Sequence, residues 1–263
     1  MKKLLIFICL IVIPQISFVK TDLLIEAINN EFRSDNNKKR DRYRNPLETL
    51  TFFEIEREKK ILEIIPGRGW YTEILSRFMK DSSNFYVATY EKPSYAIQII
   101  NKIQAEFSAY FKSNEQKFGE IKYVKIDEDF KIKDYENYFD IILTFRNTHN
   151  FLDQNKAENM YNSFHRVLKK GGILGVVQHR SSENSEFDFK KGYVKESFLI
   201  EFIKNKGFQL VEKSEINSNP KDKKNYPKGV WTLPPRLTEG EKNKEYYISI
   251  GESDRMTLKF KKK

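Results

Sequence analysis

The sequence predicts an α/β fold: a doubly wound, Rossmann-like sheet of seven strands, mostly parallel with an antiparallel last strand, and helices on both faces. Two observations predict it. Strand-like and helix-like segments alternate along most of the chain, and parallel strands need such crossover connections. The last two strand-like segments, in contrast, are separated by a long proline-containing loop without a convincing helix. That ending indicates an antiparallel edge.

Short apolar runs carry the strand predictions, and the three-and-four spacing of apolar residues carries the helix predictions. The predicted strands are residues 60–65, 85–89, 121–126, 139–145, 173–178, 208–216 and 255–261. A helix is expected after Pro46, and others over 71–79, 94–111, 154–168 and 195–206. In the fourth of these five helices one buried face is formed by Ala157, Met160, Tyr161, Phe164, Val167 and Leu168.

Length and composition indicate one large domain. The chain has 263 residues, of which 32% are charged and 39% hydrophobic, as is usual for a soluble globular protein. We assign residues 46–263 to this domain, with a long loop over 217–240. Residues 20–45 are polar and charge-rich, which predicts a leader of one helix and a loop outside the core.

The first 19 residues have the layout of a secretory signal. Lys2 and Lys3 precede an apolar run over 4–13, and Pro14 follows. Ten apolar residues are too few to span a bilayer comfortably, but the cleavage site lacks the small residues that signal peptidase prefers. The segment is therefore either a cleaved signal or an uncleaved anchor. Both alternatives predict an exported protein, periplasmic or held at the inner membrane by this segment alone.

Cysteine content and charge exclude several kinds of site. Cys9 is the only cysteine and lies in the apolar run, so the rest of the chain has no internal disulfide, Cys-ligated zinc or thiol nucleophile. No metal is implied. The net charge of +10 would suit an anionic partner, but the lysines are scattered and no arginine-aromatic stripe is present. We therefore do not expect nucleic acid as a partner.

The most informative segment, residues 61–72, runs from a strand through a glycine turn into a helix. A nucleoside cofactor at the carboxyl end of a parallel strand needs close approach to the backbone, which a Cβ atom would obstruct. Gly67 and Gly69 supply that approach. A dinucleotide-binding oxidoreductase is the rival interpretation, but its fingerprint has a third Gly or Ala where this chain has Thr72.

This segment resembles motif I of the class I S-adenosylmethionine-dependent methyltransferases. Glu63, Gly67, Gly69 and Thr72 match that motif, and Ile65 stands where it usually has a third glycine. The segment is more closely similar to a group of predicted exported bacterial methyltransferases with a Pro-Gly-x-Gly-Trp-Tyr-Thr motif. The same group resembles this chain over residues 143–150, 219–222, 229–235 and 251–256, so that the resemblance covers nearly everything after Arg40.

The resemblance implies that S-adenosylmethionine is the cofactor. The turn residues implied to bind it are Glu63, Pro66, Gly67, Gly69 and Thr72. At the end of the second strand a carboxylate is expected to accept hydrogen bonds from the ribose, and Thr89 falls in that place with Glu91 two residues later. Either Glu91 takes this role or Thr89 makes a weaker bond; the alternative is a solvent-facing Glu91.

Asp127 ends the third strand, where methyltransferases contact the adenine amino group. Its alternative role is to cap the following turn.

Polar side chains at the ends of the fourth and fifth strands are the candidates for the acceptor side, because ligands of open α/β sheets bind there. Methyl transfer is a direct displacement, and an oxygen or nitrogen acceptor must also lose a proton. His149 or His179 is the candidate base, and Arg146 or Arg180 would orient an anionic acceptor. Asn147 would contact the cofactor or the acceptor. The alternative for His149 is a hydrogen-bonded loop residue in an enzyme without a base.

Two further residues have predicted roles. The loop over 217–240 is long enough for a lid, and its Trp231 either covers the pocket or pins the loop to the sheet. His165 lies in an amphipathic helix, where a structural role is expected.

The sequence thus predicts an S-adenosylmethionine-dependent methyltransferase that acts on a small-molecule acceptor. An exported enzyme would meet little of this cofactor, so an exported, non-catalytic domain of the same fold that binds a small molecule or a protein partner is the alternative. A methyltransferase of nucleic acid or of a membrane surface, using the basic charge, is a second one.

Overall fold

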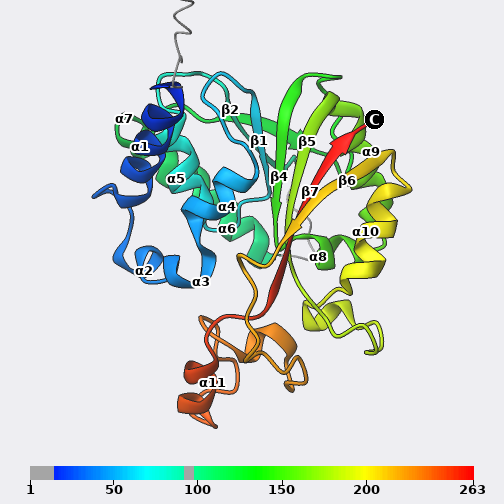
Figure 1. The fold of residues 1–263 in the computed structure, drawn as a ribbon. Helices are drawn as coiled ribbons and strands as arrows, with labels where there is room; N and C mark the ends of the chain where they lie inside the picture. The colour runs from blue at the N-terminus through cyan, green and yellow to red at the C-terminus, as the bar shows by residue number, and fades with distance from the viewer. Residues whose placement is uncertain (1–14, 92–97) are drawn as a thin grey trace, which may run out of the picture.

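The computed structural model describes residues 15–91 and 98–263 (Figure 1). Its centre is a seven-stranded sheet of order β3-β2-β1-β4-β5-β7-β6. The pairs β1–β2, β1–β4, β2–β3 and β4–β5 are parallel, whereas β7 runs antiparallel to both β5 and β6. This confirms the predicted doubly wound sheet with its antiparallel last strand.

The strands lie close to the predicted ranges. They are β1 Ile61–Ile64, β2 Phe85–Tyr90, β3 Lys122–Ile126, β4 Phe139–Phe145, β5 Leu168–His179, β6 Phe208–Ser214 and β7 Arg255–Lys262. The largest difference is at β5, which begins five residues before the predicted Ile173. Leu168 already pairs with Phe139 of β4, and the register shifts before the regular ladder resumes at Ile173.

The helices differ from the prediction in two places. They are α1 Gln15–Asn29, α2 Asp35–Lys38, α3 Asp41–Arg44, α4 Pro46–Phe52, α5 Trp70–Phe78, α6 Gln98–Ser113, α7 Glu115–Phe118, α8 Thr148–Asp153, α9 Ala157–Val167, α10 Glu196–Lys204 and α11 Lys244–Ile250. The predicted helix over 154–168 is α9, and α8 is a separate turn before Asn155, whose φ is +55°. The prediction that no helix precedes β7 is wrong, because α11 lies between β6 and β7. Residues 94–97 of the predicted 94–111 helix lie outside the described residues.

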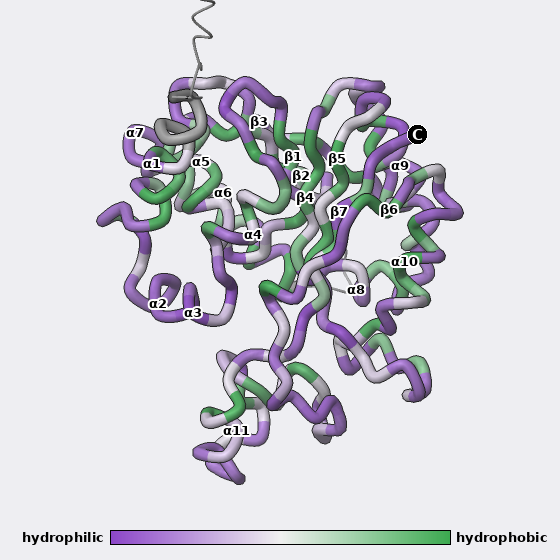
Figure 2. Tube along the Cα trace, in the orientation of Figure 1, coloured by the Kyte–Doolittle hydropathy of each residue, from purple (hydrophilic) through white to green (hydrophobic). Residues whose placement is uncertain are grey.

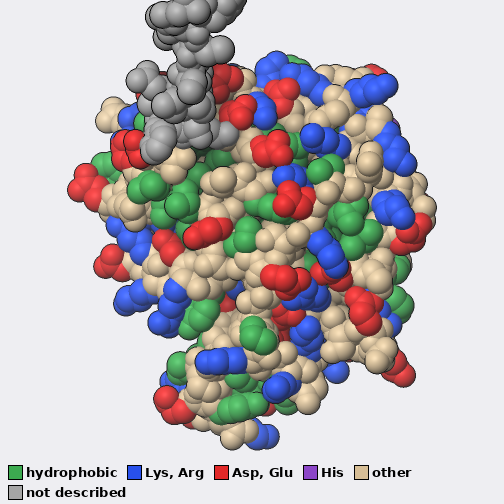
Figure 3. All heavy atoms as spheres, in the orientation of Figure 1, with side chains coloured by type: hydrophobic (Ala, Val, Ile, Leu, Met, Phe, Trp, Pro, Cys, Tyr) green, Lys and Arg blue, Asp and Glu red, His purple; other side chains and the backbone are tan. Residues whose placement is uncertain are grey.

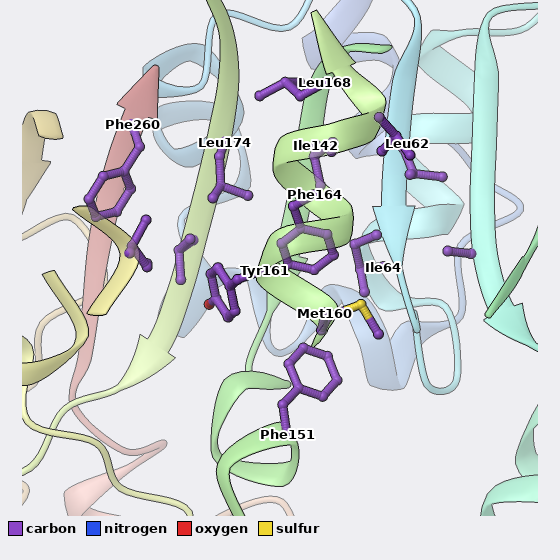
Figure 4. Packing of buried hydrophobic residues seen from close by; sticks show 14 of the residues in the cluster. Leu62, Ile64, Ile142, Phe151, Met160, Tyr161, Phe164, Leu168, Leu174 and Phe260 are labelled. Carbon is purple, nitrogen blue, oxygen red and sulfur yellow. The ribbon is translucent and has the colours of Figure 1, made fainter. Parts of the chain in front are cut away.

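Two hydrophobic clusters, one on each face of the sheet, form the core. Alternate residues of a strand point to opposite faces, so Ile61 joins the cluster of α1, α4, α5, α6 and α7, whereas Leu62 joins that of α9 and α10. Figure 4 shows Met160 and Phe164 of α9 beside Ile64 of β1. The half-buried His165 ring of the same helix lies edge-on to Phe208, with ring centroids 5.4 Å apart, as a structural residue would.

The polar leader is part of the core, contrary to the prediction for residues 20–45. Leu24, Ala27 and Ile28 of α1 pack in the cluster on the α5 face, and Arg33 and Arg44 are buried. Figure 2 shows α2 and α3 as hydrophilic segments. A charged residue of the leader can be buried where an ionic partner lies next to it. The Arg33 guanidinium, for example, donates two hydrogen bonds of 2.8 Å to the Asp41 carboxylate.

The predicted boundary at residue 19 falls inside α1. The signal-like residues 1–14 lie outside the described residues. Of the helices that the structure describes, none has the length and apolar character to cross a bilayer.

The segment between β6 and β7 forms a small lobe beyond the carboxyl ends of the parallel strands (Figure 1). Its own cluster consists of Tyr226, Leu233, Tyr247 and Ile250. The Asn219 amide joins the two ends of this segment by donating to the carbonyls of Ile250 (2.9 Å) and Glu252 (2.6 Å). Arg255 then pairs with His179 of β5. The start of β7 is thereby placed beside the ends of β4 and β5.

Candidate functional site

The turn after β1 contains two glycines, of which Gly67 faces open space and Gly69 is packed against other residues. Gly67 is exposed with φ +62°, and a Cβ built there would meet nothing within 4 Å. Pro66 is half-buried beside it, and its carbonyl accepts a hydrogen bond of 3.1 Å from the Gly69 amide. A Cβ on Gly69 would lie 2.7 Å from the ring of Phe111. Gly67 thus fits close approach of a ligand, whereas the packing of α6 requires Gly69.

The backbone is strained just before this turn. Ile65, at the position of the usual third glycine, has φ +43°, a conformation that β-branched residues rarely adopt. Asn147 at the end of β4 holds it, because its Nδ2 donates to the carbonyls of Ile64 (2.7 Å) and Ile65 (3.3 Å). The Asn147 amide nitrogen is therefore engaged with the β1 turn, and its oxygen is the atom left for a ligand.

Glu63 and Thr72 bond to each other beneath the turn. Both are buried, and the Thr72 hydroxyl donates to Glu63 Oε2 over 2.7 Å. Burial raises the pKa of Glu63 to about 8, although the Thr72 hydrogen bond opposes the rise. No Lys or Arg within the described ranges forms an ion pair with this carboxyl group. It is consequently neutral at pH 7.

The candidate ribose and adenine residues lie at neighbouring strand ends. Thr89 is buried and Glu91 is exposed at the end of β2. Asp127 Oδ1 accepts hydrogen bonds from the amides of Asp129 (3.0 Å) and Lys131 (2.8 Å), so this side chain caps the turn after β3. That is the alternative role given to Asp127. The adenine and ribose contacts stay predictions.

The structure brings His149 and His179 together. His149 lies at the start of α8 and His179 at the end of β5; both are buried, with ring centroids 5.8 Å apart. Gln178 Nε2 lies 3.2 Å from His149 Nδ1, and Ser253 Oγ lies 2.6 Å from His179 Nδ1. The Nε2 atoms of both histidines are buried without a hydrogen-bond partner among the residues described.

The hydrogen bonds assign different chemistry to the two rings. Gln178 Nε2 also donates to the Gly192 carbonyl at 2.9 Å, which identifies it as the amide nitrogen. His149 Nδ1 therefore accepts, and the neutral ring carries its proton on Nε2. The Ser253 hydroxyl can accept from His179 Nδ1, which leaves a lone pair on His179 Nε2. His149 is thus a donor, and His179 is the candidate base in the tautomer whose Nδ1–H donates to Ser253 Oγ.

Burial keeps both rings neutral. Desolvation, together with a smaller effect of Arg146, lowers the pKa of His149 to about 4, although the Gln178 hydrogen bond opposes the shift. Burial and then Arg146 also hold the pKa of His179 well below its ordinary value.

These pKa values predict acid lability below pH 6.5. The unfolded chain protonates His149 near pH 6.5 while the folded chain binds that proton only near pH 4, so stability is lost as the pH falls through this window. We expect about 3 kcal/mol from His149 alone. Urea unfolding between pH 8 and pH 4 measures it. His149→Gln should flatten the curve more than the same substitution at half-buried His165, whose pKa burial also lowers. Equal effects of the two substitutions would contradict the assignment.

Of the two candidate arginines, only Arg146 is free to contact a ligand. Arg180 is held by three carboxylates, at 2.6 Å from Glu215, 3.0 Å from Asp254 and 3.1 Å from Glu196. Of the two alternatives, the geometry therefore favours Arg146. The Arg146 side chain forms no hydrogen bond or ion pair within the described part of the chain, and burial lowers its pKa to about 10. Its backbone has φ +62°, a second strained strand end.

Sequence reasoning missed a group of arginines around Glu252. Arg40 Nε lies 2.6 Å from one carboxylate oxygen of Glu252, and Arg44 Nε and Arg255 Nη2 each lie 3.3 Å from the other. The guanidinium of Arg44 also lies over the Trp70 ring, 4.7 Å from its centroid. The resemblance over 251–256 named the segment of Glu252 and Arg255 without assigning its side chains a role.

Trp231 holds the loop in place, which is one of the two roles left open for it, and its ring also lies near the histidine pair. Its Nε1 donates to the Lys190 carbonyl over 3.2 Å, which pins the lobe to the segment after β5. Its ring lies 5.7 Å from that of His149 and 6.4 Å from that of His179. The lobe therefore covers the histidine pair.

Neither a family model nor a curated protein matches this chain. Solved structures do. A methyltransferase from Aquifex aeolicus that depends on S-adenosylmethionine matches with a TM-score of 0.52 at 17% identity, over 71% of this chain and 94% of its own. The glycopeptide N-methyltransferase MtfA, complexed with S-adenosylhomocysteine, matches with a TM-score of 0.52 at 13% identity, over 84% and 90%.

The [4+2]-cyclase SpnF matches with a TM-score of 0.59 at 13% identity, over 94% of this chain and 93% of its own. Identities this low establish the fold, and the cyclase shows that the fold also carries a different activity. The chain therefore has the fold of the S-adenosylmethionine-dependent methyltransferases.

Proposed function

We propose that this protein is an S-adenosylmethionine-dependent methyltransferase that acts on a small-molecule acceptor. The observation that carries the proposal is the turn after β1. Gly67 is left-handed, exposed and faces open space, and strained Ile65 beside it is held in place by Asn147. Strain that neighbouring residues maintain at the carboxyl end of a central strand is typical of a ligand site.

The residues present fit the cofactor. Pro66 and Gly67 would lie against it at the β1 turn, Thr89 or Glu91 would bind the ribose at the end of β2, and the Asn147 oxygen would face the same space. When bound, the cofactor supplies a methyl group on a sulfonium centre.

The chain's own residues supply the rest of the chemistry. Trp231 covers the histidine pair and excludes water from it. His179 Nε2 would accept the acceptor's proton, and His149 Nε2–H would donate a hydrogen bond that orients the acceptor. Both roles need neutral rings, which burial provides.

Calorimetric titration of the full chain with S-adenosylmethionine and S-adenosylhomocysteine tests the proposal. We expect binding that Gly67→Val weakens at least tenfold, about 1.4 kcal/mol, because valine fills the open space and strains a backbone at φ +62°.

Gly171→Val is the matched control. Gly171 is also left-handed, at φ +73°, with nothing within 4 Å of a Cβ, but it lies near the start of β5, at the opposite end of the strand from His179. The control carries the same backbone strain and should bind like the wild type. Folded wild-type protein that binds neither ligand would reject the proposal.

A further inference from the structure

The region next to the histidine pair holds more positive charge than the protein neutralises. Glu252 contacts Arg40, Arg44 and Arg255, and the charge of Arg146 acts on the same group because Glu252, Arg40 and Arg255 all perturb its pKa after burial has lowered it. Four arginines and one glutamate carry a net charge of +3. Charge buried in this way is unfavourable unless a counter-charge is supplied.

Arg44 has donors that nothing in the described protein uses. Its side chain is buried, its Nε reaches Glu252, and both Nη1 and Nη2 lack a hydrogen-bond partner. Trp70 contacts the face of the guanidinium, which leaves the N–H groups at its edge unsatisfied. Unpartnered buried donors of a charged group are rare in native proteins.

The chain's other buried arginine next to Trp70 shows the contrast. Arg33 lies 5.2 Å from the same ring, but its Nη1 donates to the Ile28 carbonyl at 2.6 Å and both of its Nη atoms donate to Asp41. Arg180, near the same strand ends, is likewise saturated by carboxylates. Only the Nε of Arg33 lacks a hydrogen bond, and it lies 3.8 Å from Glu73 Oε2. Both Nη groups of Arg44, in contrast, are without a partner.

The charges of Arg44 and Arg146 act on the proposed acceptor side. Arg44 belongs to the leader and Arg146 to the end of β4, three residues before His149. Burial lowers the pKa of His179 first, and Arg146, His149, Arg255 and Arg44 then add to the effect, which places these arginines within electrostatic range of the candidate base.

We infer that the acceptor is a small molecule with a phosphate-type dianionic group, which Arg44 and Arg146 bind beside the histidine pair. This inference rests on the proposed function. A planar guanidinium presents paired N–H donors that match a phosphate, and two such groups can grip one anion. A carboxylate would leave two of the three excess charges, and a dianion leaves one.

The test is calorimetric titration of the full chain with inorganic phosphate at about pH 8 and constant ionic strength. We expect Arg146→Gln to weaken phosphate binding at least tenfold. The variant should fold, because the Arg146 side chain gives up no hydrogen bond or ion pair to any described residue. Arg236→Gln, which removes the same charge from an exposed loop position without a side-chain bond, is the control and should bind like the wild type. Equal affinity of the wild type and Arg146→Gln, or no binding to the wild type, would overturn the inference.

A second titration, in the presence of saturating S-adenosylhomocysteine, distinguishes an anion site for the acceptor from a site for the cofactor's own carboxylate. Phosphate that binds equally with and without S-adenosylhomocysteine supports an acceptor site. Competition between the two would assign the arginines to the cofactor and overturn the inference, while leaving the proposed function intact. Phosphate binding without any S-adenosylhomocysteine binding would instead reject the proposed function and keep the anion site.

Discussion

Replacement of Glu252 by glutamine should lower the free energy of unfolding by about 3–5 kcal/mol, the usual effect of removing one partner from a buried ion pair. Burial alone would raise the pKa of this carboxyl group, yet Arg44, Arg255 and Arg40 hold it well below its ordinary value. Its charge is thus the counter-charge for several guanidinium groups. The side chains of Arg44 and Arg255 are at most 3% exposed. In the variant, their buried charges lose the carboxylate that neutralises them.

Denaturant unfolding of the full chain measures the effect. Glu245→Gln, an exposed position in the first turn of α11 without a side-chain bond, is the control and should change stability by no more than about 0.5 kcal/mol. Inorganic phosphate should stabilise Glu252→Gln more than the wild type, because the variant carries one more unneutralised positive charge. If Glu252→Gln unfolds like the control, Glu252 does not neutralise the arginines.

Most of the fold could be predicted because its signals are local. Alternating apolar runs and helical periodicity define a parallel sheet, and Leu62 and Phe164 occupy the core positions that this pattern assigns to them. The helix α11 could not be found in the same way, since it has only seven residues and only Tyr247 and Ile250 of them are buried. The leader was misjudged on composition, because ion pairing lets Arg33 be buried.

Part of the candidate site could likewise be predicted from local signals, and part could not. Gly67, Asn147 and the two histidines follow strands, so the rule that ligands bind at the carboxyl ends of strands finds them. The arginines around Glu252 come from the leader and from the start of β7, about 200 residues apart in sequence. No spacing rule connects such distant positions, and only packing brings them together. Charge scattered along the sequence also looks scattered on the surface, where Figure 3 shows acidic and basic side chains interspersed.

The buried carboxyl group of Glu63 predicts a second large effect on stability. It lowers the free energy of unfolding as the pH rises, whereas the histidines lower it as the pH falls. Its pKa is about 8 in the folded protein, because of burial, against an ordinary value of 4.5. Below pH 4.5 the group is neutral in both states. As the pH rises from 4.5 to 8 the unfolded chain ionises while the folded chain stays neutral, so stability falls by up to about 5 kcal/mol.

Glu63→Gln removes this titration and should become more stable than the wild type as the pH rises from 5 to 8, by several kcal/mol. Urea unfolding at both pH values measures the difference. Thr72→Val offers a second check: the Thr72 hydroxyl stabilises the ionised carboxylate through its 2.7 Å hydrogen bond, so its loss should move the end of the decline to higher pH. Parallel pH curves for the wild type and Glu63→Gln would show that the buried carboxyl group is not neutral.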